Sequence, residues 1–136
     1  MSYRNRILLV DDDPVFLEVL KGSLENQYEI VVAESGSAAM SYLSQTMRVD
    51  MIILDIIMPE MDGYELMERI KKLPICTDVP VMFLTGVTGH EAEIKGLGTG
   101  VCDYIAKPFR TEVFIARVAA NLRAAKRLVH ASWHFA

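Results

Sequence analysis

Short apolar runs alternate along the chain with longer stretches in which apolar residues recur at helical spacing. Five runs rich in Ile, Val and Leu predict strands at Arg6 to Val10, Glu29 to Ala33, Met51 to Leu54, Val79 to Leu84 and Asp103 to Ala106. Runs with so little polar alternation are typical of parallel strands buried on both faces. The pattern therefore predicts a doubly wound α/β fold with a five-stranded parallel sheet and right-handed helical crossovers.

The stretches between the strands predict helices. Their apolar residues are spaced by three or four positions, at Phe16, Leu20 and Leu24, at Ala39, Leu43 and Met47, and at Leu66, Ile70 and Leu73. Asp13 followed by Pro14 predicts the cap and first residue of the first helix. A fourth helix is expected from about Thr88 to Thr99, with His90 near its beginning and Gly96 inside it. Glycine costs about 1 kcal/mol in a helix interior, so a loose, moving helix and a closely packed helix that needs small residues both fit.

The fifth helix is expected to begin near Thr111 and to extend beyond the needs of a small domain. Its apolar stripe continues through Phe114, Val118, Leu122, Ala125 and Val129. The 136 residues are enough for one domain with one core. We therefore expect residues 1–125 to form the domain and residues 126–136 to continue the fifth helix or form a tail.

Composition and charge exclude several classes of protein. A net charge of −4 and a pI near 5.3 argue against a surface built to bind nucleic acid or an anionic membrane through basic charge, while leaving room for a local basic patch. The apolar run Ile7 to Val10 stops at aspartates, which argues against a signal peptide, and no run approaches the roughly 20 residues of a membrane span. The expected location is the cytoplasm. Cys76 and Cys102 have neither metal-site nor disulfide-framework spacing, so we expect free, buried thiols.

Carboxylates follow two of the predicted strands. Asp11 and Asp12 follow the first, and Asp55 follows the third. In a doubly wound sheet these strand ends share one rim, where ligands bind. Clustered carboxylates repel one another unless a cation holds them, and an all-oxygen site with room for water suits Mg²⁺. The sequence therefore predicts a magnesium site.

A hydroxyl and a cation follow the other two strands at the same rim. Thr85 ends the fourth strand and Lys107 follows the fifth. A lysine beside acids also fits a structural ion pair, but that alternative does not account for the hydroxyl. Together the groups form a complete set for phosphoryl transfer, with Asp55 attacking in line and the cations neutralising the equatorial oxygens.

Four motifs make the chain resemble the receiver domains of two-component response regulators over about residues 5 to 125. They are ILLVDDD, ILDIIMPEMDGYEL, VMFLTG and DYIAKPF, in the order and spacing of that family. The resemblance implies a flavodoxin-like, chemotaxis-regulator-like fold with five helices and strand order 2-1-3-4-5. It implies phosphorylation of Asp55, and Mg²⁺ held by Asp12, Asp55 and the carbonyl of Ile57, with Asp11 reaching it mainly through water.

The resemblance also implies a switch and its partners. Lys107 matches the lysine that contacts the phosphoryl group, before a proline whose peptide bond is typically cis. Thr85 matches the hydroxyl that moves to the phosphoryl group, and Tyr104 the ring that turns inward. The fourth helix, fifth strand and fifth helix are then the output surface and a possible homodimer interface. A sensor histidine kinase or histidine phosphotransfer protein is the expected donor, with an effector domain or protein downstream.

Two branched residues stand beside the expected phosphoryl group, where many relatives carry polar side chains. Ile57 lies two positions after the acceptor and Val87 two after Thr85. Apolar groups shield an acyl phosphate and cannot orient water, so we expect a long-lived phosphorylated state.

Two other functions remain open. An interaction module with this fold could work without phosphorylation. An aspartate-nucleophile phosphatase of the haloacid-dehalogenase type would use the same groups, but the chain is short for its cap domain and only loosely fits its motif. The receiver reading implies that the chain is not an enzyme, beyond catalysing its own phosphorylation and dephosphorylation.

Overall fold

The structure is a computed structural model that describes residues 4–45 and 48–135, and only the backbone of residues 128–135. Strands and helices alternate along the chain. The strands are β1 (Arg6–Val10), β2 (Glu29–Ala33), β3 (Met51–Leu54), β4 (Val81–Thr85) and β5 (Asp103–Ala106). The helices are α1 (Pro14–Leu24), α2 (Gly36–Leu43), α3 (Gly63–Lys71), α4 (His90–Leu97) and α5 (Thr111–Phe135), with a short 3₁₀ turn η1 (Pro74–Cys76) before β4.

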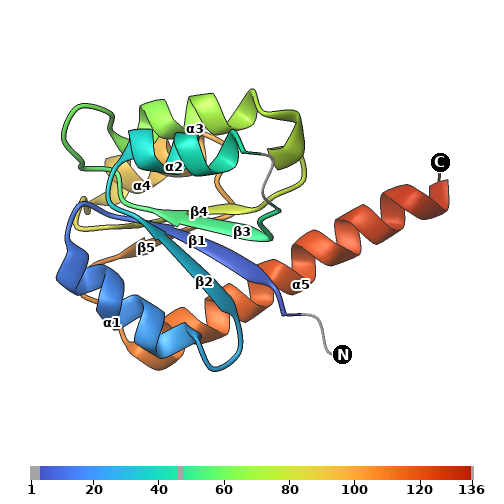
Figure 1. The fold of residues 1–136 in the computed structure, drawn as a ribbon, viewed down its shortest axis with the longest axis horizontal. Helices are drawn as coiled ribbons and strands as arrows, with labels where there is room; N and C mark the ends of the chain where they lie inside the picture. Colours follow the sequence, from blue (N-terminus) through green and yellow to red (C-terminus); the bar gives the residue numbers. More distant parts are fainter. Residues whose placement is uncertain (1–3, 46–47, 136) are drawn as a thin grey trace.

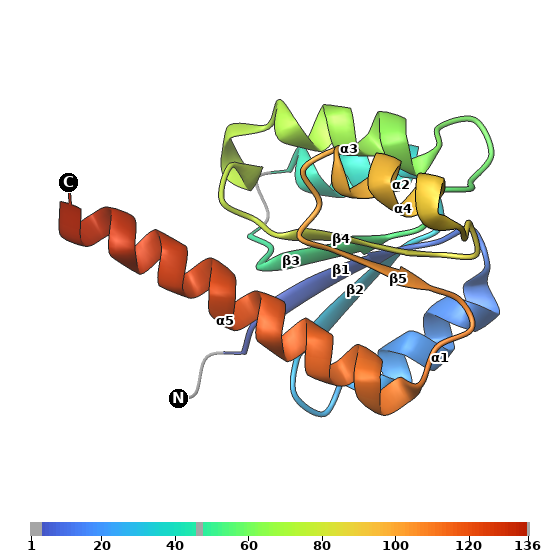
Figure 2. The same cartoon turned by 180° about the vertical axis from the view of Figure 1, so that it is seen from behind.

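The five strands form one parallel sheet in the order β2-β1-β3-β4-β5, which confirms the predicted fold class and strand order. Helices α2, α3 and α4 cover one face of the sheet, and α1 and α5 cover the other (Figures 1 and 2). Each face has its own apolar core, because residues that alternate along a strand point to opposite faces. All carboxyl ends of the strands therefore lie at one rim, where the connecting loops meet.

Side-chain caps fix where the helices begin. Asp13 precedes α1 and accepts hydrogen bonds from the amides of Val15 and Phe16, and Asp62 precedes α3 and accepts from the amide of Glu65. The predictions of Asp13-Pro14 as the start of α1, and of His90 as the start of α4, are confirmed. Asp13 is thus engaged as a cap beside the acidic cluster.

Several predicted boundaries need correction. Strand β4 begins at Val81, two residues later than expected, because Val79 still belongs to the turn after η1, where its amide bonds to the Cys76 carbonyl. Helix α4 is shorter than predicted and ends at Leu97, and α3 ends before Leu73. Met47, expected on the second helix, lies outside the described residues.

The two cysteines differ in exposure. Both are free, but only Cys76 is buried, and Cys102 is exposed, so the expectation of a buried thiol is wrong there. Cys102 lies in the connection between α4 and β5. It is one residue before β5 begins and is therefore outside the sheet.

Helix α5 is the longest helix that the structure describes, with 25 residues. Its residues Phe114, Val118 and Leu122 are buried against the α1 side of the sheet. The helix then continues to Phe135 and projects beyond the body of the domain (Figures 1 and 2). The side chain of Val129, the last residue of the predicted stripe, lies outside the described residues. Within residues 4–45 and 48–135, none of the helices combines the length and apolarity needed to cross a bilayer.

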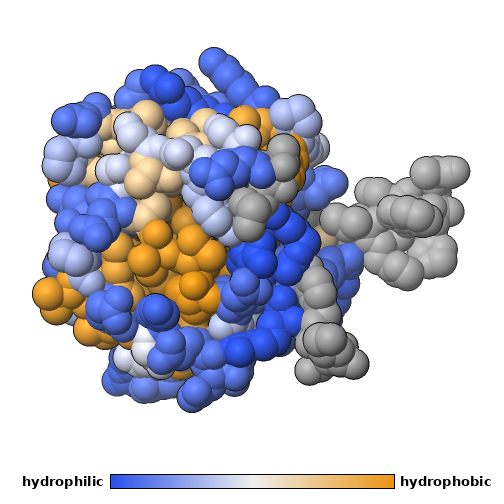
Figure 3. Space-filling view, in the orientation of Figure 1, coloured by the Kyte–Doolittle hydropathy of each residue, from blue (hydrophilic) through white to orange (hydrophobic). Residues whose placement is uncertain are grey.

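One face of the molecule carries an apolar patch over β2 and α1 (Figure 3). β2 is an edge strand of the sheet. Its Val32 is exposed, as are Val15 and Val19 on one side of α1. The patch lies next to the rim because Val15 is in the first turn of α1.

Candidate functional site

Backbone hydrogen bonds between strand ends position the residues at the rim. The amide of Asp55 donates to the carbonyl of Val10 (3.0 Å), the last residue of β1, so Asp55 lies beside Asp11. The amide of Lys107 donates to the carbonyl of Thr85 (2.8 Å). Asp11, Asp55 and Lys107 each lie one residue beyond the end of a strand, and Thr85 is the last residue of β4. The parallel sheet therefore brings the acids, the hydroxyl and the lysine to the same rim.

Three carboxylates converge at this rim. Oxygen atoms of Asp11, Asp12 and Asp55 lie within 4.8 Å of one another. Asp11 and Asp55 are buried, with 3% and 8% of their surface exposed, whereas Asp12 is exposed. Hard oxygen ligands with one side open to water match what Mg²⁺ requires, so this set of donors fits the ion.

Lys107 lies within the same pocket. Its Nζ is 2.8 Å from Oδ2 of Asp11 and 3.4 Å from Oδ2 of Asp55. The closer partner is Asp11, not the expected phosphoacceptor. The Lys107-Pro108 peptide bond is cis, as predicted.

Burial and neighbouring charge have opposite effects on the pKa values of Asp11 and Lys107. Burial raises the pKa of Asp11, and the hydrogen bond from Lys107 offsets this only in part. Burial by itself would lower the pKa of Lys107, but its hydrogen bond to Asp11 and the charges of Asp55 and Asp11 together raise that pKa above its usual value. Lys107 thus stays charged beside Asp11, whose charged form is disfavoured by burial.

Thr85 and Tyr104 lie on the other side of the rim and make neutral hydrogen bonds. Thr85 is fully buried, and its Oγ1 accepts a hydrogen bond from the amide of Val87 (3.2 Å). The hydroxyl of Tyr104 donates to the carbonyl of the same Val87 (2.6 Å). Tyr104 itself is buried, so its ring points inward in this structure. Val87 therefore connects the two predicted switch residues through its backbone.

Gly96 of α4 makes room for the Tyr104 ring. A Cβ on Gly96 would lie 2.5 Å from Cδ2 and Cε2 of that ring. This close approach decides between the two interpretations of α4 at this position: the helix is closely packed there and needs a residue without a side chain.

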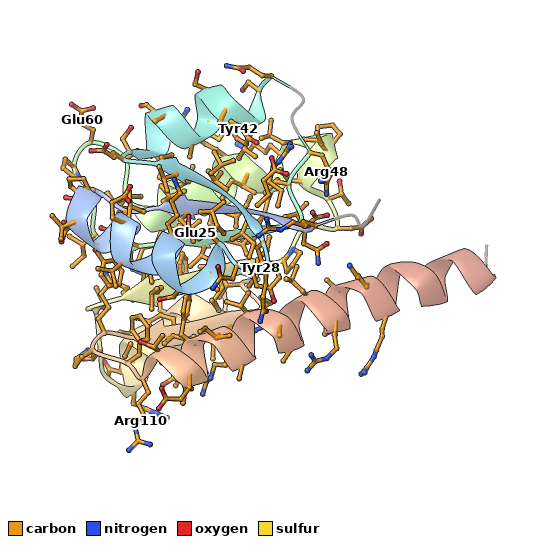
Figure 4. The ribbon with its side chains drawn as sticks, turned by 60° about the horizontal axis from the view of Figure 1, so that its bottom comes forward. Glu25, Tyr28, Tyr42, Arg48, Glu60 and Arg110 are labelled. Atoms are coloured by element: carbon orange, nitrogen blue, oxygen red, sulfur yellow. The ribbon has the colours of Figure 1, made fainter. Side chains whose placement is uncertain are left out.

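The loop after Asp55 forms the next wall of the site. The amide of Ile57 donates to Oδ1 of Asp55 (3.4 Å), while its side chain is 64% exposed. Glu60 adopts a left-handed conformation (φ 69°) and its side chain points away from the body (Figure 4). A Cβ on Gly63 would lie 2.4 Å from the carbonyl oxygen of Asp55, so the sharp return of this loop requires glycine.

One contact of Lys107 was not foreseen from the sequence. The ring centroid of Phe16 lies 4.1 Å from Nζ of Lys107. In the sequence, Phe16 belongs to the apolar stripe of the first helix. The signal that could have indicated the contact is its place in the first turn of that helix, which starts beside the acidic cluster at the rim.

The family model for the response regulator receiver domain matches residues 7–119. The chain belongs to this family. It is therefore a receiver domain of the response regulators of two-component systems.

Curated relatives agree with this assignment. The chain is 41% identical over 120 residues to the response regulator GtcR of Aneurinibacillus migulanus, covering 88% of this chain and 48% of that protein. It is 34% identical to the DNA-binding dual master transcriptional regulator RpaA of Synechocystis, covering 95% and 54%. It is 39% identical to a Vibrio cholerae protein named "Probable cyclic di-GMP phosphodiesterase", covering 86% and 26%. The receiver chain thus spans between about a quarter and a little over half of the relatives it matches.

Solved structures share the whole fold. The signal receiver domain of a signal transduction histidine kinase from Syntrophus aciditrophicus superposes with a TM-score of 0.81 at 36% identity, covering 90% of this chain and 93% of that one. The chemotaxis protein CheY4 of Vibrio cholerae gives 0.80 at 27% identity, covering 88% and 99%. The chemotaxis-regulator-like fold predicted for the receiver domain is confirmed.

Proposed function

We propose that Asp55 of this receiver domain accepts a phosphoryl group in a Mg²⁺-dependent reaction. The single observation that supports this most strongly is the convergence of Asp11, Asp12 and Asp55 with the Lys107 ammonium in one pocket. A nucleophilic carboxylate in a pocket with a lysine and a cation-binding cluster is the minimum set for phosphoryl transfer.

Asp11, Asp12, Asp55 and the carbonyl of Ile57 are the proposed ligands of Mg²⁺, with Asp11 acting mainly through water. When bound, the ion would neutralise charge on the phosphoryl oxygens. The exposed position of Asp12 leaves space for water in the coordination shell.

The reacting group is the carboxylate of Asp55. One of its oxygens attacks phosphorus in line, a new P–O bond forms, and the P–N bond of the phosphohistidine donor breaks with its electron pair leaving on the imidazole. Lys107 needs to move only a short distance to contact the phosphoryl group, because it already contacts Asp55. Asp11 then keeps the lysine in the pocket.

Thr85 and Tyr104 are the proposed switch. In its present hydrogen bond the Thr85 hydroxyl accepts from the amide of Val87. A phosphoryl group on Asp55 would offer the O–H of Thr85 a charged acceptor, which makes a stronger hydrogen bond than a neutral one. Movement of Thr85 and of the Val87 backbone would change the surface formed by α4, β5 and α5, because Tyr104 is bonded to Val87. This surface is the proposed contact for output.

The partners follow from the family. We propose a sensor histidine kinase or a histidine phosphotransfer protein as the donor, and an effector domain or protein as the target, with a homodimer through α4, β5 and α5 as one output. No direct contact with nucleic acid or membrane and no turnover of an external substrate are part of the proposal, and the cytoplasm remains the expected location. The division into residues 1–125 and an extension 126–136 likewise stays a prediction.

The test is phosphorylation with a small donor. Wild-type protein and the Asp55→Asn variant are incubated with acetyl phosphate, with Mg²⁺ or with EDTA, and the mass of the intact protein is measured. We expect one phosphoryl group per chain, only with Mg²⁺ and only with Asp55 present. Asp62→Asn is the matched control, because asparagine also caps α3.

Two outcomes would contradict the proposal. Absence of any label on the folded wild-type protein would favour an interaction module that works without phosphorylation. Repeated turnover of a phosphomonoester would favour the phosphatase alternative.

A further inference from the structure

Phe16 is fixed at the rim by the start of α1. It is the third residue of that helix, and its amide donates to the Asp13 cap (3.3 Å). Its side chain is partly buried against the core on the α1 side of the sheet. The backbone of Phe16 is therefore held by a side chain that lies beside the acidic cluster.

The ring of Phe16 is fixed by the same loop that carries the lysine. Phe109 follows the cis proline after Lys107, and its ring meets that of Phe16 edge to face, with centroids 6.2 Å apart and planes at 82°. Phe109 in turn lies 5.2 Å from the fully buried Phe114. A chain of three rings thus connects the core to the wall of the pocket.

The ammonium of Lys107 has three neighbours at the rim. It contacts the carboxylates of Asp11 and Asp55, and its Nζ lies 4.1 Å from the centroid of the Phe16 ring. This distance is within the range of about 6 Å at which a ring face attracts a cation. The ring face has no lone pair. It therefore attracts the ammonium without accepting a hydrogen bond from any of its three N–H groups.

A neutral partner suits a pocket that must accept an anion. A third carboxylate beside Lys107 would hold the ammonium equally well, but it would repel an incoming phosphoryl group. An aromatic face carries no net charge, so it can restrain the lysine and leave the pocket's charge unchanged. The ring thus holds the lysine in place, while the carboxylates neutralise its charge.

We propose that Phe16 is a positioning residue that holds the Lys107 ammonium at the phosphoacceptor through its ring face. This inference rests on the proposed phosphorylation of Asp55. Without the ring, the lysine would sample positions toward solvent, and the phosphoryl group would meet its cation less often.

The competing explanation is that Phe16 only fills the core. The two are separated by changing the charge distribution of the ring at constant shape. Phenylalanine carrying one, two or three ring fluorines is incorporated at position 16, because each fluorine weakens the negative face of the ring. The same series at position 114, which contacts Phe109 and is fully buried, is the matched control.

The rate of Mg²⁺-dependent labelling of Asp55 by acetyl phosphate is measured at saturating and at low donor concentration, with urea unfolding of every variant. We expect the rate to fall stepwise with fluorine number at position 16, by about three- to tenfold over the series. It should fall by a similar amount in Phe16→Leu and be retained in Phe16→Tyr. The series at position 114 should leave the rate unchanged.

A second measurement does not need phosphorylation. The ring current of Phe16 should shift the NMR signal of the Lys107 ε-methylene upfield, and Phe16→Leu should abolish this shift while the fluorinated series at position 114, which keeps the shape of that ring, preserves it. A shift that persists in Phe16→Leu would overturn the inference. So would equal labelling rates across the fluorinated series at position 16 in a wild-type background that is itself labelled. Failure of the wild-type protein to be labelled would instead reject the proposed function.

Discussion

The lysine side and the threonine side of the site are built from different interactions. Lys107 is held by ionic contacts to Asp11 and Asp55, at 2.8 and 3.4 Å. The side-chain hydroxyls of Thr85 and Tyr104 instead make neutral hydrogen bonds to the backbone of Val87, at 3.2 and 2.6 Å. The first set lies toward α1 and the second toward α4.

This difference separates two tasks. Ionic contacts in a buried pocket are costly to break, so the lysine side is suited to stay in place and accept an anion. A neutral hydrogen bond contributes about 1 kcal/mol, so the threonine side can exchange one partner for another at little cost. A domain that both captures a phosphoryl group and reports it needs one rigid side and one movable side.

The largest expected effect is on the lysine side. Lys107→Met should lower the rate of Asp55 labelling on the order of 10²-fold, as the loss of a group that stabilises charge in a transition state does in enzymes. Lys95→Met on α4 is the matched control, because Lys95 also lies over a ring, that of Tyr64, but away from the acids. If Lys107→Met kept the wild-type rate of Asp55 labelling, the lysine side would not be the side that captures the phosphoryl group.

The same variant should show a pH-dependent loss of stability. Removal of Lys107 takes away a contact that lowers the pKa of Asp11, which burial already raises. A carboxyl whose folded-state pKa lies above its unfolded value stabilises the fold when protonated, and this contribution is lost as pH rises through the folded-state value. The deficit of Lys107→Met in EDTA should therefore be about 1–3 kcal/mol at pH 7 and shrink toward pH 4, measured by urea unfolding.

On the threonine side, the largest effect should come from a methyl group. Gly96→Ala places a carbon 2.5 Å from the Tyr104 ring. We therefore expect the free energy of unfolding, measured in urea, to fall by about 1–3 kcal/mol and the Tyr104 ring to turn outward. Gly22→Ala in α1 meets nothing within 4 Å and should instead stabilise by about 0.5–1 kcal/mol. Adding Tyr104→Ala to Gly96→Ala should remove most of the clash in a double-mutant cycle. Simple additivity would mean that the ring and the helix are not coupled.

The next effect concerns water at the acyl phosphate. Val87 is half-buried beside the switch, and Val87→Glu should speed dephosphorylation about tenfold by placing a group that can orient water. Decay of the labelled protein after removal of the donor measures this rate, and Val87→Leu is the apolar control. An unchanged or slower decay would refute the shielding role of Val87.

The smallest effect is the loss of one hydroxyl. Tyr104→Phe removes the hydrogen bond to the Val87 carbonyl and should cost about 1 kcal/mol in urea unfolding. Labelling of Asp55 should stay within about twofold of wild type, because the hydroxyl lies on the side that reports and not on the side that captures. A large fall in labelling would show that the two sides are not separable.

The sequence predicted the elements because each is encoded locally. Apolar runs, helical spacing and Asp13-Pro14 indicate strands, helices and a cap without knowledge of any distant contact. The boundary errors at β4 and α4 fall where turns compete with regular structure, since the turn bond of Val79 depends on the packing of η1.

For the site, the sequence determined which groups arrive at the rim, because charged residues cannot remain in strands buried on both faces. It could not indicate that Lys107 contacts Asp11 more closely than Asp55, that the Phe16 ring lies against Lys107, or that Gly96 faces Tyr104. The contacts of Lys107 join segments far apart in the chain, whereas Gly96 and Tyr104 lie on the consecutive elements α4 and β5. All of these contacts depend on helix placement and side-chain rotamers, which only the packing of α1 and α4 against the sheet decides.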